Sequence, residues 1–152
     1  DDIPILAVRE RLRGFVDASR KAGIERPEQL IYINAVNEEA IFGIVGDLLE
    51  RRPRITAILA SDSIVGADVF LALSKFGIRV PQDMSFVSWF DADWAKIASP
   101  SVTVVDQPTY AFGAQATKCL IERMNGSTIE PRKLLLSTKL IERDSVGMAA
   151  PA

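Results

Sequence analysis

The chain has 152 residues, 48% of them hydrophobic, which is enough for one globular domain with a single sizeable core. Its 18 basic and 20 acidic side chains give a net charge of -2, which argues against a nucleic-acid-binding surface, because phosphate binding needs clustered Lys and Arg. The lack of histidine and the single cysteine, Cys119, exclude Ser-His-Asp catalysis, an internal disulfide and any Cys- or His-based metal cluster.

Helices and strands are predicted to alternate over the first 60 residues. Apolar residues at helical spacing predict a helix from Val8 to Ala22, where the following glycine ends it. Residues 30–34 form a short apolar run that is typical of a buried strand, and a second amphipathic helix covers 41–49. The nearly all-apolar run 55–60 predicts a strand that is covered on both faces.

A third helix is predicted from 63 to 76, and it is apolar on two sides. Its core stripe begins at Val65, while Ala67, Phe70 and Leu71 form a second apolar patch. A helix with two apolar sides packs on its own sheet and on another surface. We therefore expect this patch to form the contact between two copies of the chain in a homodimer.

The remaining elements complete the alternating pattern. Residues 84–89 and 102–106 predict two more strands, a final helix runs from Pro108 to about Asn125, and 133–141 is an extended segment. Strands that alternate with helices indicate an α/β fold with a doubly wound parallel sheet, because right-handed crossovers place the helices on both faces.

Polar and aromatic residues follow the predicted strands at the edge where ligands bind in sheets of this kind. Arg11, near the start of the first helix, is expected to join them on this rim. Arginine donors, carboxylates and an aromatic face together suit a small polyol. The residues that follow the strands are Asn34, Ser61, Asp62, Trp89, Phe90, Asp91, Asp106 and Gln107.

These residues also have purely structural interpretations. Asp62 is a natural N-cap for the third helix, Asn34 and Asp106 are common turn residues, and the two tryptophans suit a core. Asp91 and Asp93, two apart in a loop, are better suited to solvating or capping it than to acid–base catalysis. No glycine-rich nucleotide loop follows a strand, so no cofactor or metal is expected.

Five segments resemble the LacI/GalR family of bacterial transcriptional regulators. The two most specific are GIRVPQDMSFVSWFD at 77–91 and SPSVTVVDQP at 99–108, and the others are RERLRGF at 9–15, ITAILASD at 55–62 and LIERDS at 140–145. The resemblance implies a periplasmic-binding-protein-like fold of type I, of which this chain forms mainly the C-terminal subdomain. It also implies a small-molecule effector of the sugar or nucleoside class.

The resemblance assigns roles to individual residues. The family's effector-binding arginine falls on Arg11, and its glutamine falls on Gln107. Its Asn-Asp pair falls on residues 61–62, where serine replaces the amide. In the segment matching 88–91, the first of two aspartates, which accepts bonds from sugar hydroxyls, is replaced by Phe90. This change favours a flatter or less hydroxylated ligand than a typical hexose.

In that family a DNA-binding headpiece and a first subdomain precede the part that resembles this chain. We therefore expect 1–152 to be an effector-binding and dimerisation fragment that meets DNA only through a headpiece outside the sequence, with about 107–135 crossing to the first subdomain. The family's opening strand lies between the strands at 30–34 and 55–60, and its loss leaves backbone groups unpaired. An upstream segment, the Ile3–Leu6 run or a second copy would have to fill the gap.

Three functional hypotheses follow. The first is the ligand-sensing domain of a repressor, which is not an enzyme and in which a bound small molecule shifts the population of two arrangements. The second is a periplasmic sugar-binding protein of a transport system. The third, a flavodoxin-like enzyme or response domain, is disfavoured by the missing histidine and phosphate loop. Without a signal-peptide pattern or a membrane-spanning run, we expect a cytoplasmic protein with no membrane contact.

Overall fold

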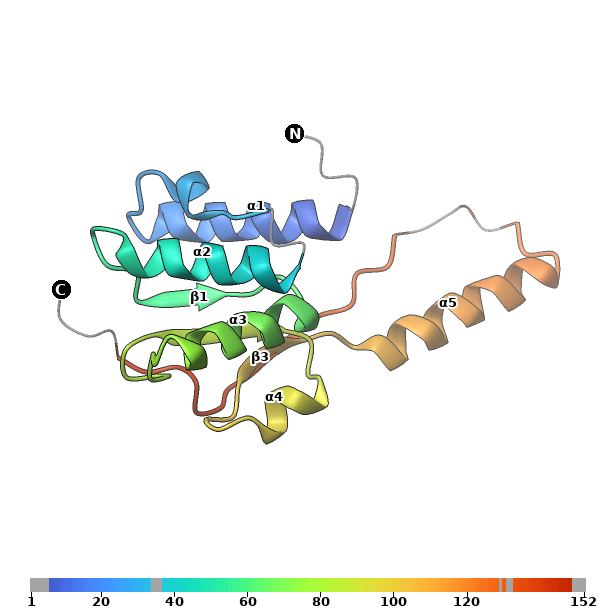
Figure 1. Cartoon of the computed structure of the whole chain (residues 1–152). Coiled ribbons are helices and arrows are strands. Elements are labelled where there is room, and N and C mark those ends of the chain that lie inside the picture. Colours follow the sequence, from blue (N-terminus) through green and yellow to red (C-terminus); the bar gives the residue numbers. More distant parts are fainter. Residues whose placement is uncertain (1–5, 34–36, 129, 131–132, 149–152) are drawn as a thin grey trace.

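A computed structural model of the chain describes residues 6–33, 37–128, 130 and 133–148 (Figure 1). The predictions for Asn34 and for most of the Ile3–Leu6 run lie outside these residues. The helices, in chain order, are α1 (Leu6–Lys21), the short 3-10 helix η1 (Pro27–Leu30), α2 (Glu38–Glu50), α3 (Ser63–Lys75), α4 (Asp93–Ile97) and α5 (Thr109–Met124).

One four-stranded sheet organises the fold. It consists of β1 (Ala57–Leu59), β2 (Ser85–Trp89), β3 (Thr103–Asp106) and β4 (Lys139–Ile141), in the order β1-β2-β3-β4. The first three strands are parallel, and β4 runs antiparallel to β3. The α/β class and the parallel core are therefore confirmed, although the extended segment at the C-terminal end makes the sheet mixed.

The prediction of a strand at 30–34 is wrong within the described residues. η1 ends at Leu30, and Ile31 to Ile33 follow it outside any strand. β1 pairs only with β2, so its other edge has no strand beside it in the described part of the chain. An apolar run with no neighbouring strand has no ladder to join, and the side chain of Ile33 is accordingly 64% exposed.

The core lies between the sheet and the pair α2 and α3, which pack against each other. Each helix begins at a side-chain cap: the Oδ1 atom of Asn37 accepts the N–H of Ala40 at 2.8 Å, and Asp62 serves α3 in the same way. The largest fully buried side chains of this core are Phe86, Ile41, Leu73, Met84, Val45, Val102 and Val104.

The turn that leads into β2 is held by an ion pair. The backbone N–H and two guanidinium nitrogens of Arg79 donate to the Asp83 carboxylate at 2.8–2.9 Å. The side-chain and backbone hydrogen bonds from Arg79 hold the pKa of Asp83 well below its ordinary value. The segment GIRVPQD at 77–83 therefore forms a structural turn ahead of β2.

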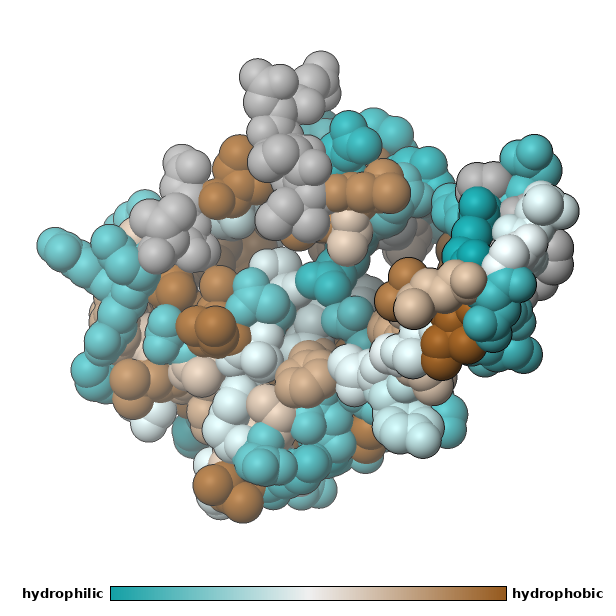
Figure 2. Space-filling model, turned by 90° about the vertical axis from the view of Figure 1, so that its right-hand side faces the viewer, coloured by the Kyte–Doolittle hydropathy of each residue, from teal (hydrophilic) through white to brown (hydrophobic). Residues whose placement is uncertain are grey.

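Two helices pack less completely than the sequence predicts. The apolar side of α1 is only half-buried, and Ser19 is the one residue of this helix that is buried. α5 extends away from the sheet and contains no buried residue (Figure 1). Seen from the side on which α5 leaves the body, the surface carries several apolar patches (Figure 2). Within the described residues, no helix combines the length and apolar character needed to cross a membrane.

A tight contact at Gly66 fixes the approach of α3 to β2, and we expect Gly66→Ala to destabilise the fold. A Cβ atom at this position would lie 2.3 Å from the Ser88 Oγ atom and 3.2 Å from the Trp94 ring. Because Ser88 is fully buried, its side chain has no room to move away from the added methyl group. The free energy of unfolding should therefore fall by about 2 kcal/mol. Urea denaturation measures this change.

Gly43→Ala is the matched control, because Gly43 also lies within a helix but has no atom within 4 Å of the position of an added Cβ. This substitution should leave the stability unchanged or raise it by up to about 1 kcal/mol through helix propensity. Equal effects of the two alanines would rule out close packing at Gly66.

Candidate functional site

The carboxyl ends of β1 and β2 bring three of the predicted rim residues together. Arg11, in the second turn of α1, donates from Nη1 to the backbone carbonyl of Ser61 at 2.7 Å. Its guanidinium carbon also lies 4.4 Å from the centre of the Trp89 ring, in a cation–π contact. One arginine therefore ties a loop after β1 to the end of β2, at the edge where ligands bind in parallel sheets.

Asp62 serves as the N-cap of α3. Its Oδ1 atom accepts the backbone N–H groups of Ile64 and Val65, each at 2.9 Å, and its Oδ2 atom lies 3.5 Å from the Ser61 hydroxyl. The structural interpretation of Asp62 is therefore the one that the geometry supports. Capping uses Oδ1 and leaves Oδ2 with the long contact to the Ser61 hydroxyl, so a ligand role for Asp62 stays a prediction.

Asp91 is bound to a cation from the C-terminal part of the chain. Nη2 of Arg143 lies 2.6 Å from Asp91 Oδ1, and both side chains are more than four-fifths buried. Nη1 of the same arginine donates to the carbonyl of Val102 at 2.8 Å, while Lys96 Nζ approaches Asp91 Oδ2 at 3.9 Å. The negative charge of Asp91 is therefore balanced by cations within the protein, which makes this carboxylate a poor acceptor for a ligand hydroxyl.

Phe90 is the described non-glycine residue with a left-handed backbone, at φ 71°. Its N–H continues the β2–β3 ladder by donating to Val105, and its carbonyl accepts the N–H of Ala92 at 3.0 Å. This conformation costs a residue with a Cβ atom on the order of 1–3 kcal/mol, and the surrounding contacts must hold it. The ring is 38% exposed at the rim, directly after Trp89.

Asp106 ends β3 and Gln107 follows the strand, and the two residues differ in their position relative to the rim. The register pairs Trp89 with Val105, so the alternation of side chains places Asp106 on the opposite face of the sheet from Trp89. Gln107 follows it and is partly buried, and its carbonyl accepts the N–H of Thr109 at the start of α5. A ligand role for Gln107 stays a prediction, whereas Asp106 lies on the face away from Arg11.

The predicted dimer patch is only partly exposed. Phe70 packs on Phe86, with ring centres 5.7 Å apart, and on Trp94 at 6.2 Å, so it belongs to the core and not to an outer surface. Ala67 is half-buried, while Leu71 is 42% and Ile64 is 76% exposed. The outer stripe of α3 therefore consists of Ile64, Ala67 and Leu71.

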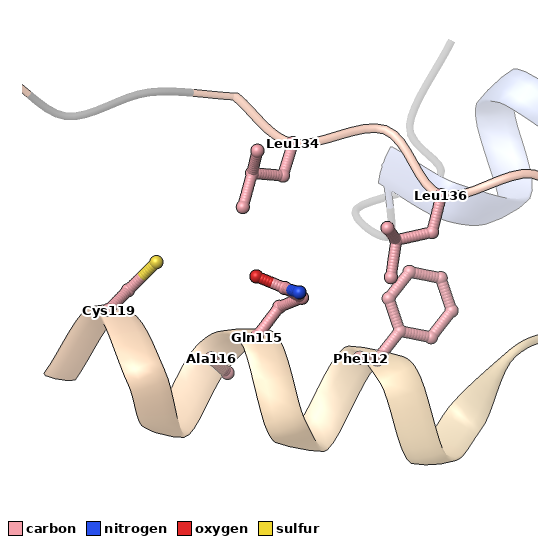
Figure 3. Close-up of a pocket in the computed structure, with 6 residues that line it drawn as sticks. All are labelled: Phe112, Gln115, Ala116, Cys119, Leu134 and Leu136. Atoms are coloured by element: carbon pink, nitrogen blue, oxygen red, sulfur yellow. The ribbon is translucent and has the colours of Figure 1, made fainter. Parts of the chain in front are cut away.

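A cavity of about 190 Å³ lies elsewhere, between α5 and the extended segment 134–136. Figure 3 shows Phe112, Gln115 and Cys119 directed from the helix toward Leu134 and Leu136. The Cys119 thiol is partly buried among these groups. The cavity shares no residue with the Arg11–Trp89 rim.

Arg143 and Ser145, in the C-terminal segment, have roles that the sequence did not predict. Ser145 is fully buried, where its hydroxyl accepts the N–H of Thr103 and donates to the carbonyl of Phe86 at 2.6 Å. It thereby joins the β2 and β3 backbones, while Arg143 fixes Asp91. Both residues lie in the LIERDS segment at 140–145, but that pattern does not say what they contact, which the three-dimensional pairing reveals.

Known proteins are similar to this chain in fold and in sequence. Residues 7–146 match the model of the periplasmic binding protein-like domain family. The chain belongs to this family. Within the family it groups with the effector-binding domains of LacI-type transcriptional regulators, as the resemblance of its segments implies.

Two similar proteins and one solved structure are informative. A probable opine utilization operon repressor of Rhizobium rhizogenes is 35% identical over 94% of this chain and 73% of its own length. The HTH-type regulator CelR of Thermobifida fusca is 34% identical over 90% of this chain, which spans 40% of that protein. A solved complex of a transcriptional regulator CelR with cellobiose superposes with a TM-score of 0.74 at 32% identity, covering 90% of this chain and 42% of that one.

Proposed function

We propose that the chain is the ligand-sensing part of a LacI-family transcriptional repressor and that a small molecule binds at the rim formed by Arg11, Ser61 and Trp89. The contact of Arg11 with both other residues carries this proposal. It holds a guanidinium against an aromatic face at the ligand-binding edge of a parallel sheet. Gln107 and Phe90 complete the rim, while Asp62 and Asp91 act as structural residues.

The relatives support a small polar effector. One is a CelR complexed with cellobiose, and another is a probable repressor of opine utilization. Ligand binding would shift the population between two arrangements of the parent protein, which its DNA-binding part senses. With a net charge of -2 here, DNA contacts would come from residues outside this sequence, in the cytoplasm where such regulators act.

The two other hypotheses have less support. A transport-type binding protein is not favoured, because the curated relatives described above are transcriptional regulators. A flavodoxin-like enzyme would need a reacting group, and the sequence contains no histidine to act as a general base. Binding without turnover is therefore the function that we assign.

We expect Arg11→Ala to weaken effector binding by about 2 kcal/mol or more, because a ligand loses a charged hydrogen-bond partner. A panel of sugars, sugar acids and nucleosides identifies a binding molecule, and calorimetry then measures its affinity. Arg13→Ala is the matched control, since Arg13 lies on the same helix, is 70% exposed and pairs with Glu10. Equal affinity of the Arg11 variant and the unmodified chain would remove Arg11 from the site.

We also propose that two chains associate through the outer stripe of α3. Ile64 and Leu71 are exposed apolar residues one helical turn on either side of Ala67, a spacing that gives a continuous apolar stripe. Ile64→Glu should weaken dimerisation at least tenfold, as measured by light scattering over a dilution series. Phe70→Glu is unsuitable for this test, because it would disrupt the core.

Met148→Glu, which places the same charge on a side chain that is 95% exposed, serves as the control for the dimer. An Ile64→Glu protein that dimerises as tightly as this control would place the interface on another surface.

A further inference from the structure

We propose that the ligand at the Arg11–Trp89 rim carries a carboxylate, an inference that rests on the proposed function and specifies its ligand class. No carboxylate among residues 6–33, 37–128, 130 and 133–148 forms an ion pair with Arg11. Its polar partner in that part of the chain is the backbone carbonyl of Ser61, which neutralises no charge.

The carboxylates that stand near the rim are already engaged. Asp62 accepts two backbone N–H groups of α3, and Asp91 faces Arg143 on one side and Lys96 on the other. Asp106 is directed to the opposite face of the sheet. Asp62 keeps its charge at this edge, because backbone N–H groups do not neutralise a carboxylate, but among the described residues none of these three carboxylates pairs with Arg11.

Hydrogen-bond chemistry points the same way. An arginine has five N–H donors and no acceptor, and the described contacts of Arg11 use one donor, on Nη1. The hydroxyl oxygens of a neutral polyol can also accept from these donors, but each hydroxyl brings a proton that needs an acceptor of its own. A carboxylate only accepts, and its two oxygens match the fork of a guanidinium.

The surroundings strengthen such a pair. The guanidinium lies over the half-buried Trp89 ring, and Phe90 adds a second apolar ring at the same edge. Aromatic groups lower the local dielectric constant, so a charge pair formed there is stronger than one in open water. The Ser61 contact also fixes the arginine before the ligand arrives, which reduces the entropy lost on binding.

The two tryptophans provide a direct test in the 152-residue chain. Trp89 contacts Arg11, while the Trp94 indole N–H donates to the carbonyl of Ser63 at 3.1 Å and serves as an internal reference. In ¹⁵N-labelled protein each indole gives one resonance, assigned by the Trp89→Phe substitution. The probes are three matched pairs: glucuronate with glucose, gluconate with sorbitol, and phenylacetate with phenylacetamide, all at constant ionic strength.

We expect at least one carboxylate to shift the Trp89 resonance at a dissociation constant at least tenfold below that of its neutral partner, with the Trp94 resonance unchanged. Arg11→Gln should abolish the preference, Arg11→Lys should retain part of it, and Arg13→Gln should leave it intact.

Other results would overturn the inference in distinguishable ways. Neutral members that bind as tightly as their acids, with Trp89 shifted, would leave the ligand site in place and refute the carboxylate. A preference that survives Arg11→Gln would assign it to another cation. If no probe moved the Trp89 resonance at millimolar concentration, both the carboxylate and the proposed site would be refuted.

Discussion

Arg143→Ala is expected to lower the free energy of unfolding by about 3 kcal/mol, the lower end of the range for breaking a buried ion pair. The substitution leaves the Asp91 carboxylate, which is 18% exposed, without its partner at 2.6 Å. Lys96 Nζ, at 3.9 Å, compensates only weakly. The Val102 carbonyl also loses its bond to Nη1. Urea denaturation monitored by circular dichroism measures the loss.

Arg13→Ala is again the matched control, because the Arg13–Glu10 pair has a similar distance of 2.8 Å but exposures of 70% and 50%. It should cost about 0.5 kcal/mol or less, as exposed pairs do. Adding Asp91→Ala to Arg143→Ala should restore part of the lost stability by removing the unpaired charge. A cost for Arg143→Ala no greater than that for Arg13→Ala would show that the pair does not hold the turn after β2.

The effect should also reach the ligand site. Asp91 follows Phe90, whose left-handed backbone at φ 71° must be held by its neighbours. The Asp91–Arg143 pair anchors this turn from the far end of the chain. Ligand affinity at Trp89 should therefore fall in Arg143→Ala, even though no hydrogen bond or ion pair among the described residues joins Arg143 to Arg11, Ser61 or Trp89.

Local patterns were sufficient to predict most of the fold. The helical spacing and the glycine after Ala22 predict α1, and the cap at Asp62 places the start of α3 correctly. The short α4 was not predicted, because five residues are too few to establish a helical period. The strand at 30–34 failed for another reason, since a strand exists only where a neighbour pairs with it, and the sequence of a segment does not contain its neighbour.

The sequence likewise predicted some features of the rim and not others. The order of strands and helices was enough to group Arg11, Ser61 and Trp89 at one edge, and the structure brings these three into contact. It was not enough to tell a free carboxylate from an engaged one. Asp91 is engaged because Arg143, 52 positions away in sequence, reaches it. The sequence around Phe70 likewise does not show its partner, because Phe86 lies on β2, which comes later in the chain.

The outer edge of β1 creates the second large effect that we expect. Within the described residues, β1 pairs on one side only, although its sequence is as apolar as that of a central strand. Leu59 is 46% exposed there, and the apolar stripe of α1 at Leu12 and Phe15 is only half-buried. Unpaired N–H and C=O groups beside apolar side chains form a template for another strand.

We therefore expect the 152-residue chain to self-associate through this edge and Leu59→Lys to weaken the association roughly ten- to a hundredfold. Burying a leucine contributes about 1.5–3 kcal/mol, each 1.4 kcal/mol is tenfold in affinity, and a lysine at an edge resists pairing. Sedimentation velocity over a concentration series gives the dissociation constants. Leu135→Lys, at an 82% exposed position far along the chain, should leave them unchanged, and Ile64→Glu separates this contact from one through α3. A chain that stays monomeric at high concentration, or a Leu59→Lys protein that associates like the Leu135 control, would mean that the edge of β1 is closed within a single chain.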